Sequence, residues 1–593
     1  MYTQPAPDRL KKVPSKTAVL IASGDSRDIA NSTCWPAQKQ LEGDAKKAFA
    51  RLGWKLIRAG GENYGKGHGF IDSQARGREV FAQIHPDAPL VVAEAVWQFS
   101  HHVLIGLARH RGPILILANW SGQWPGLVGA LNLRGSLTKA GVEHSMLWGE
   151  DFADERFMKK LGQWVKKGRI KHDLSHVRRL DAADLPGRER RLGEALAAEL
   201  RRRPAILGVF DEGSMGMFNA IIPDQLLHEA GAFKERLSQS QLYAAMQGVP
   251  DAEADQARQW LQAKGMKFET GPDPATDLTE GQIREQCRMY IAALRMGAAY
   301  GCDAIGIQYQ LGLNQTCAAS DLAEGLLNCS DRPPVLGEDG KPLYAGRPLT
   351  HFNEVDECAG LDGLITQRVW TAMGLEPDNT LHDVRWGEEF PARAAGDQGR
   401  SGADSSAPAK AGGEPSGAGA GKDAGPAYVW VFEISGAVPP SHLEGGYAGA
   451  TGQRQPPMYF HRGGSTINGV SKAGEVVWSR IYVDHDKDGC ERLSMDLGRC
   501  KAVSLPAEET ERRRRATTPQ WPIMHAVLYG IDRDQFMAKH QSNHIQVVYA
   551  PDPKTADKAL ATKAAMADAM GLRVNLCGAA HDGRPLAQRL RRM

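Results

Sequence analysis

The chain lacks several features that would each have placed it in a well-defined class. Its nine cysteines include no C-x-x-C pair, which argues against a disulfide framework and against a structural zinc site. No run approaches the roughly 18 apolar residues of a membrane span, and the first twelve residues, M-Y-T-Q-P-A-P-D-R-L-K-K, precede no apolar segment of the kind found in signal peptides. We therefore expect a cytoplasmic protein with no membrane partner.

An excess of charge is also missing. The 72 Lys and Arg residues nearly balance the 70 Asp and Glu residues, which leaves a formal net charge of +2. Such a balance provides no general electrostatic field for nucleic acid or an anionic surface. The glycine-rich segment 211–219 matches neither the P-loop nor the dinucleotide fingerprint, and the G-x-S-x-G and H-E-x-x-H signatures do not occur. We expect no nucleic-acid partner.

Short apolar runs alternate with helix-length segments in the first two hundred residues. Runs of this length between polar or Gly/Pro residues are typical of buried parallel strands. They occur at 17–23, 54–59, 90–96 and 113–120. A charged helix near 188–203 then ends at Pro204, and another buried run follows at once. We predict a doubly wound α/β domain over 1–204 and a second α/β domain over 205–375.

The composition changes in the last third of the chain. Within 391–426, proline aside, no apolar residue is larger than alanine, so this insertion cannot bury enough surface to offset its ordering entropy. We predict that it is disordered. The following runs at 428–434 and 475–483 are rich in β-branched and aromatic residues, and a β-α-β unit closes the chain. The third predicted domain, 376–593, is therefore β-rich and barrel-like.

Three short segments carry the candidate chemistry. They are H-F-N-E-V-D at 351–356, L-H-D-V-R-W at 381–386 and S-N-H-I at 542–545. Their Glu354, Asp383 and His544 are two carboxylates and an imidazole, the usual ligands of an open divalent-metal site, and two carboxylates also suit proton transfer. Taken singly, each residue has a structural interpretation: a helix start, a salt bridge to Arg385 and a structural histidine. If they meet in space, the chain is a metal-dependent enzyme.

Further motifs accompany these segments in chain order. They are S-M-G (214–216), G-I-Q-Y-Q (306–310), S-D-L-A-E-G-L-L-N (320–328), G-G-Y (445–447), E-T-E-R-R-R-R-A-T-T-P-Q-W-P (509–522) and L-R-V-N-L-C (572–577). Together with N-E-V-D and D-V-R, this order resembles the L-fucose/L-arabinose isomerase superfamily, and most specifically its fucose isomerase branch. The resemblance covers residues 205–580 and is weaker over 1–204. It implies an aldose–ketose isomerase that acts on a free sugar such as L-fucose or D-arabinose through an enediolate.

The resemblance also implies roles for individual residues. Glu354 and Asp383 match the catalytic carboxylates and, with His544, would hold Mn²⁺, with Mg²⁺ as the alternative. The implied sugar contacts are Gln308, Tyr447, Trp521, Asn543, Arg27 and Trp97. In this family the N-terminal domain, which here bears Arg27 and Trp97, enters the active site of a neighbouring subunit, and the assembly is a homohexamer.

Two other classes of function stay open on the sequence. A sugar-binding or regulatory protein can use the same scaffold, because a fold does not determine a function. A metal-dependent lyase, hydrolase or epimerase can apply the same enediolate chemistry to another polyol or sugar acid. The presence of all three metal-ligand candidates favours an enzyme.

Overall fold

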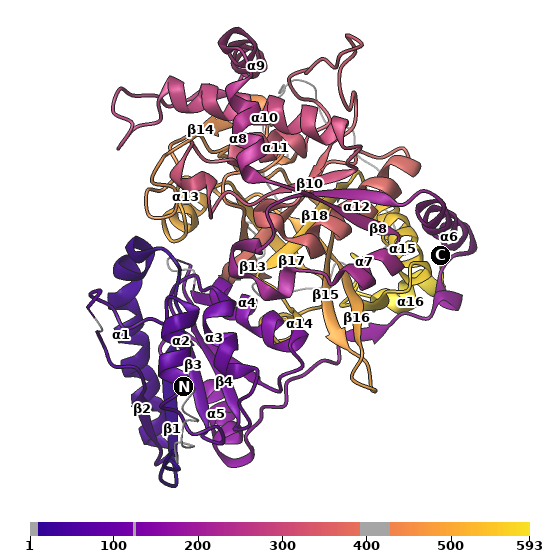
Figure 1. The fold of residues 1–593 in the computed structure, drawn as a ribbon. Coiled ribbons are helices and arrows are strands. Elements are labelled where there is room, and N and C mark those ends of the chain that lie inside the picture. The colour runs from indigo at the N-terminus through magenta and orange to yellow at the C-terminus, as the bar shows by residue number, and fades with distance from the viewer. Residues whose placement is uncertain (1–9, 64, 123–125, 392–426) are drawn as a thin grey trace, which may run out of the picture.

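A computed structural model describes residues 10–63, 65–122, 126–391 and 427–593. The predicted disordered insertion 391–426 therefore lies, after its first residue, outside the described part of the chain. Three main sheets organise the remainder, and the N-terminal one lies beside the other two with its own helices (Figure 1).

The N-terminal sheet has five parallel strands in the order β2-β1-β3-β4-β5. Apolar cores cover both of its faces, which explains why its strands other than the edge strand β2 are nearly continuous apolar runs. The strand order reverses between β1 and β3, and the carboxyl ends of such strands form a ligand crevice in doubly wound folds. The elements are β1 (Thr17–Ala22), α1 (Asp28–Arg51), β2 (Lys55–Arg58), α2 (Gln74–Phe81), β3 (Leu90–Glu94), α3 (Ser100–Leu107), β4 (Ile114–Asn119), α4 (Gly126–Lys139), β5 (Ser145–Gly149) and α5 (Glu155–Lys167).

A second parallel sheet of four strands follows, in the order β11-β10-β7-β8. Its long helix α10 begins with a capping box at Thr279, whose side chain and that of Gln282 satisfy each other's backbone N–H groups. The elements are β7 (Ala205–Phe210), α7 (Asp224–Glu229), β8 (Ala232–Leu237), α8 (Gln239–Gln247), α9 (Asp251–Ala263), β9 (Lys267–Phe268), α10 (Glu280–Ala299), β10 (Ala304–Ile307), α11 (Asp321–Leu327), β11 (Thr350–His351) and α12 (Glu357–Ala372).

The third sheet is mostly antiparallel and closes into a barrel. The strands pair in the order β15-β18-β12-β13-β17-β16, and β16 pairs again with β15. The elements are β12 (Asn379–Phe390), β13 (Ala427–Glu433), β14 (Thr451–Gly452), β15 (Gly474–His485), β16 (Glu491–Ala502), α13 (Ala507–Arg515), β17 (Ile523–Leu528), α14 (Arg533–Lys539), β18 (His544–Ala550), α15 (Pro553–Ala569), β19 (Arg573–Cys577) and α16 (Leu586–Arg591). The predicted fold class, two α/β units followed by a barrel-like β-rich unit, is confirmed.

The chain crosses the predicted domain borders in two places. Strand β6 (Val177–Arg179) pairs with β19 of the C-terminal sheet, and α6 (Gly187–Arg202) packs its Gly193 against α15. In the other direction, residues 435–473 return to the second unit, where β14 pairs with β9 in a separate two-stranded sheet. These exchanges bury apolar surface that neither unit would cover alone, and they bring all three units together around one cavity.

The described helices include none that combines the length and the apolar character needed to cross a lipid bilayer.

Candidate active site

The structure brings together the three predicted metal ligands. Asp383 on β12 and His544, the first residue of β18, are direct partners across two antiparallel strands of the barrel. Glu354 comes from the turn that follows β11 of the second sheet. The Nε2 atom of His544 lies 3.5 Å from Oδ1 of Asp383 and 4.0 Å from Oε2 of Glu354. Residues almost two hundred positions apart in sequence therefore share one site.

Two strained turns face each other at the carboxyl ends of β7 and β11. Glu354 and Val355 have φ angles of 57° and 56°, and Ser214 and Met215 have φ angles of 41° and 49°. For residues other than glycine, this left-handed conformation costs about 1–2 kcal/mol each. The Ser214 hydroxyl donates to the carbonyl oxygen of Val355, and Gln308 Nε2 donates to that of Glu354 at 3.1 Å. The surrounding contacts thus impose the strain and aim the Glu354 carboxylate, an arrangement typical of functional sites.

The buried Glu324 supports the turn that carries Glu354. Glu324 on α11 is almost fully buried, and its carboxyl group accepts hydrogen bonds from Asn353 Nδ2 and from the Ser320 hydroxyl. Burial holds the pKa of Glu324 well above its ordinary value. Because Asn353 directly precedes Glu354, Glu324 helps to determine where the catalytic candidate points.

The second ring nitrogen of His544 is held by Asp356. His544 Nδ1 lies 2.7 Å from Asp356 Oδ2, and Arg480 on β15 binds the same carboxylate at 2.6 and 3.1 Å. Burial opposes the charge of Asp356, but Arg480 and the hydrogen bond to His544 prevail and lower the Asp356 pKa to about 2. The charged Asp356 accepts the Nδ1–H and directs Nε2 toward the two carboxylates. Histidines that bind metals are usually oriented by such a carboxylate.

Both carboxylates that face His544 are harder to ionise than usual. Burial raises the pKa of Glu354 to about 7; the neighbouring Asp383 adds to the rise, and His544 and Arg27 oppose it. Burial also raises the pKa of Asp383, against the effects of His544 and Arg385. Each of the two side chains keeps 19% of its surface exposed, so both are accessible. A carboxylate with a pKa near neutrality is well matched to general-base catalysis.

A cavity opens in front of these two carboxylates, and all three units contribute to its wall. Besides Glu354 and Asp383 it is lined by Arg27, Trp97, Val128, Met215, Gln310, Arg385, Ser435, Tyr459, Phe460 and Trp521. Arg27 and Trp97 follow the carboxyl ends of β1 and β3, at the point where the strand order of the N-terminal sheet reverses. The cavity thus lies at the position where doubly wound folds bind ligands.

Arg27 and Trp97 differ from the expectation in one respect. We expected them to serve a neighbouring subunit, whereas the structure places both in the cavity of their own chain. Arg27 Nη1 donates to Gln310 Oε1 at 2.8 Å, and its guanidinium group lies 4.9 Å from the ring centre of Tyr459. These contacts form because the crevice of the N-terminal sheet faces the second sheet and the barrel of the same chain.

Three other predicted sugar contacts lie at or beside the cavity, with different roles. Trp521 forms part of the wall, and its indole N–H donates to Gln455 Oε1 at 2.8 Å. Asn543 Nδ2 lies 3.3 Å from Asp383 Oδ1 and orients that carboxylate. Gln308 is fully buried behind the Glu354 turn, so it supports the backbone and does not line the cavity.

The predicted role of Tyr447 does not agree with its position. Its hydroxyl donates to the carbonyl oxygen of Asp331 at 2.6 Å, and its ring packs edge-on against Trp260, so it belongs to the apolar core of the second unit. The ring in the cavity is that of Tyr459, which stacks against Trp521 with centroids 5.8 Å apart. Tyr459 lies in a turn at 457–459, and no motif of the sequence marks it as a site residue. The path of the returning segment decides which tyrosine reaches the site.

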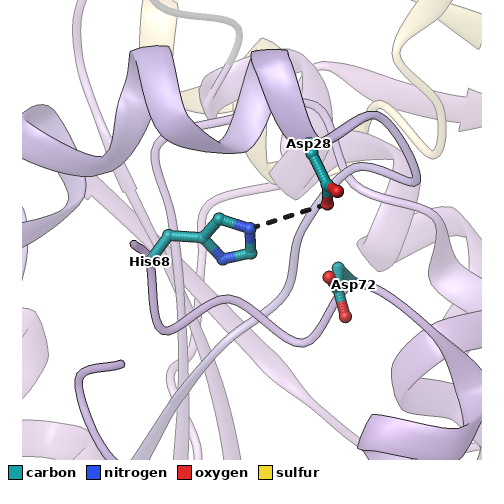
Figure 2. Close-up of side chains that lie close together, drawn as sticks. All are labelled: Asp28, His68 and Asp72. Atoms are coloured by element: carbon teal, nitrogen blue, oxygen red, sulfur yellow. Dashed lines mark ion pairs between the residues drawn. The ribbon is translucent and has the colours of Figure 1, made fainter. Parts of the chain in front are cut away.

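A second group of side chains could also hold a metal ion. Asp28, His68 and Asp72 each offer one ligand atom, and these atoms all lie within 4.8 Å of one another. Figure 2 shows Asp28 at the start of a helix, facing His68 and Asp72 on the loop beneath it. No other group of three such side chains in the described part of the chain is as compact, including the one around His544. The sequence offered no signal for it, because Asp28 and His68 stand forty positions apart and share no motif.

Comparisons with known proteins do not extend these assignments. No family model matches the chain, and no curated protein matches it.

Proposed function

We propose that the chain is a metal-dependent aldose–ketose isomerase that acts on a free sugar, with L-fucose or D-arabinose as the first candidates. The observation that supports this most directly is the approach of Glu354 and Asp383 to His544 Nε2, at 4.0 and 3.5 Å, beside a cavity with aromatic walls. Two carboxylates and one imidazole fit Mn²⁺ or Mg²⁺. Asp356, behind the imidazole, is the orienting partner that such a ligand requires.

A bound ion would act as a Lewis acid that stabilises negative charge on the sugar oxygens, an effect worth several kcal/mol. Glu354 is the base that removes the proton from C2 of the aldose and returns it to C1. Asp383 accepts the proton of the C2 hydroxyl as the C2 carbonyl forms, and donates it to the oxygen on C1. The number of protons is conserved, and the enediolate is the shared intermediate. The pKa of Glu354, near 7, suits a group that both takes and returns a proton.

The charges around the cavity favour an uncharged sugar over a sugar phosphate or sugar acid. Each arginine in the wall is already paired with a buried carboxylate: Arg27 lies 2.6 Å from Asp25, and Arg385 lies 2.8 Å from Glu433. No excess positive charge is therefore presented by these arginines to an anionic substrate. The rings of Trp521, Tyr459 and Trp97 offer apolar surface for the C–H faces of a sugar.

One experiment separates the candidate functions. The protein is incubated with a panel of aldoses in D₂O containing Mn²⁺ and followed by NMR. Ketose formation with deuterium at C1 or C2 supports the isomerase. Sugar binding without exchange would support a sensor instead, and cleavage of the carbon chain would support a lyase.

The role of Glu354 is tested with Glu354→Gln, which keeps the shape of the side chain and removes its basicity. We expect normal folding and a loss of turnover by about 100-fold or more. The matched control is Glu338→Gln, which makes the same change in an exposed turn. Near-normal isomerisation by Glu354→Gln would refute the assignment.

A further inference from the structure

The compact group near the start of α1 already contains a positive charge. Lys66 Nζ lies 2.7 Å from Asp72 Oδ2 and 3.2 Å from Asp28 Oδ1, so its ammonium group lies between the two carboxylates. His68 Nε2 approaches the same Asp28 oxygen at 3.9 Å. The ammonium group of Lys66 therefore lies where the two carboxylates favour a cation.

Two carboxylates face the one ammonium group of Lys66, so a doubly charged ion matches their charge better than the lysine does. The side chains of His68 and Asp72 are 0% and 3% exposed, whereas those of Lys66 and Asp28 are 44% and 65% exposed. The lysine can therefore turn out into solvent, and an ion can enter from the side of Asp28.

We infer that Asp28, His68 and Asp72 form a second site for a divalent cation of the Mn²⁺–Zn²⁺ class, which the ion occupies by displacing Lys66. Two oxygen ligands and one imidazole nitrogen suit this class of ion. A doubly charged ion neutralises both carboxylates, whereas the lysine neutralises one. The inference does not depend on the proposed isomerase activity, since none of these residues lines the cavity.

Occupation of this site has a structural consequence. His68 and Asp72 belong to the segment between β2 and α2, and Asp28 is the first residue of α1. An ion bound by all three therefore clamps this segment to the start of the helix. Asp28 directly follows Arg27, whose guanidinium group lines the cavity. A bound ion would therefore fix the backbone at Arg27 without contacting a substrate.

Metal binding by the full-length protein tests the inference. In a Glu354→Gln/Asp383→Asn background, which disables the first site, equilibrium dialysis against Mn²⁺ and separately against Zn²⁺ should still find one ion per chain. Adding His68→Ala should weaken that binding by about 100-fold or more. Adding Asp28→Asn, an exposed change that leaves the core untouched, should weaken it by about tenfold or more. Asp44→Asn, elsewhere on α1, is the control and should change nothing. Undiminished binding in both His68→Ala and Asp28→Asn would overturn the inference.

Removal of the competing lysine should change the affinity for the ion in the opposite direction. Lys66→Met should raise the affinity for the ion about 3- to 10-fold, because two partly exposed ion pairs no longer have to be broken. If the group existed only as a salt bridge of Lys66, this variant would bind no metal. Hydrogen exchange gives an independent readout: ion binding should protect the amides of residues 65–72, and His68→Ala should abolish that protection.

Discussion

Replacement of Asp356 by asparagine separates two roles that the structure combines in one carboxylate. Asp356 is fully buried, pairs with the buried Arg480 and accepts the Nδ1–H of His544. Asparagine has nearly the same shape but leaves the Arg480 charge unpaired. Removal of one partner from a buried ion pair typically costs about 3–5 kcal/mol, so we expect the free energy of unfolding to fall by that amount. Because His544 also loses its orienting charge, we expect metal affinity to fall by about 10- to 100-fold.

A second variant tells these effects apart. In Asp356→Asn/Arg480→Met the unpaired charge is gone, so urea unfolding should show most of the lost stability restored. Metal affinity, measured by Mn²⁺ titration, should stay low, because His544 still lacks its carboxylate. The reasoning is refuted if the double variant recovers metal affinity together with stability, or if Asp356→Asn binds metal as tightly as the wild type.

The same carboxylate predicts a pH dependence of stability. The pKa of Asp356 is about 2 in the folded chain, below its ordinary value of 3.8. A lowered pKa stabilises the folded state at pH values above the unfolded pKa, and that contribution, about 2 kcal/mol, is lost as the pH falls from about 4 toward 2. Stability curves measured from pH 6 to pH 2 should therefore show a smaller acid-induced loss in Asp356→Asn than in the wild type.

Three further predictions concern the cavity. Treatment with EDTA should abolish isomerisation and added Mn²⁺ should restore it; turnover without metal would contradict the mechanism. Glu324→Leu should lower kcat by about 100-fold, because it removes the acceptor for Asn353 Nδ2 and so releases the Glu354 turn. Glu324→Gln still accepts the hydrogen bond from Asn353 and should retain most activity. Tyr447→Phe should lower the free energy of unfolding by about 1 kcal/mol, because the hydrogen bond to Asp331 is lost, and should leave KM unchanged. Tyr459→Ala should raise KM with little loss of stability. The reverse pattern would identify Tyr447 as the sugar contact.

Much of the fold was predictable because its signals are local. The inner strands of the two parallel sheets, such as β1 and β7, are buried on both faces, so they appear as short continuous apolar runs at 17–23 and 205–210. Closure of the barrel was harder to predict. The second pairing of β16 with β15 depends on contacts between strands, and these leave only alternation of apolar and polar residues in the sequence.

The candidate site was predictable in part, through motif order and not through any local pattern. Glu354, Asp383 and His544 could be named because they stand in recognisable segments, yet each alone had a structural interpretation. Gln310 ends the motif G-I-Q-Y-Q but was not among the predicted sugar contacts, whereas Tyr459 and the pairing of Lys66 with Asp28 and Asp72 carried no such signal. The predicted homohexamer stays a prediction, and so does the identity of the sugar.

The sequence by itself determined the element types, the α/β and β-rich halves, and the residue types available for catalysis, because helix and strand patterns and ligand chemistry are properties of neighbouring residues. Only the tertiary structure decided that Asp383 and His544 are cross-strand partners, that Glu354 meets them from another sheet, and that Asp28 meets Asp72 and His68. Such meetings depend on strand register and on the paths of returning segments. These are set by the burial of apolar surface across the whole chain, and no short stretch of sequence encodes them.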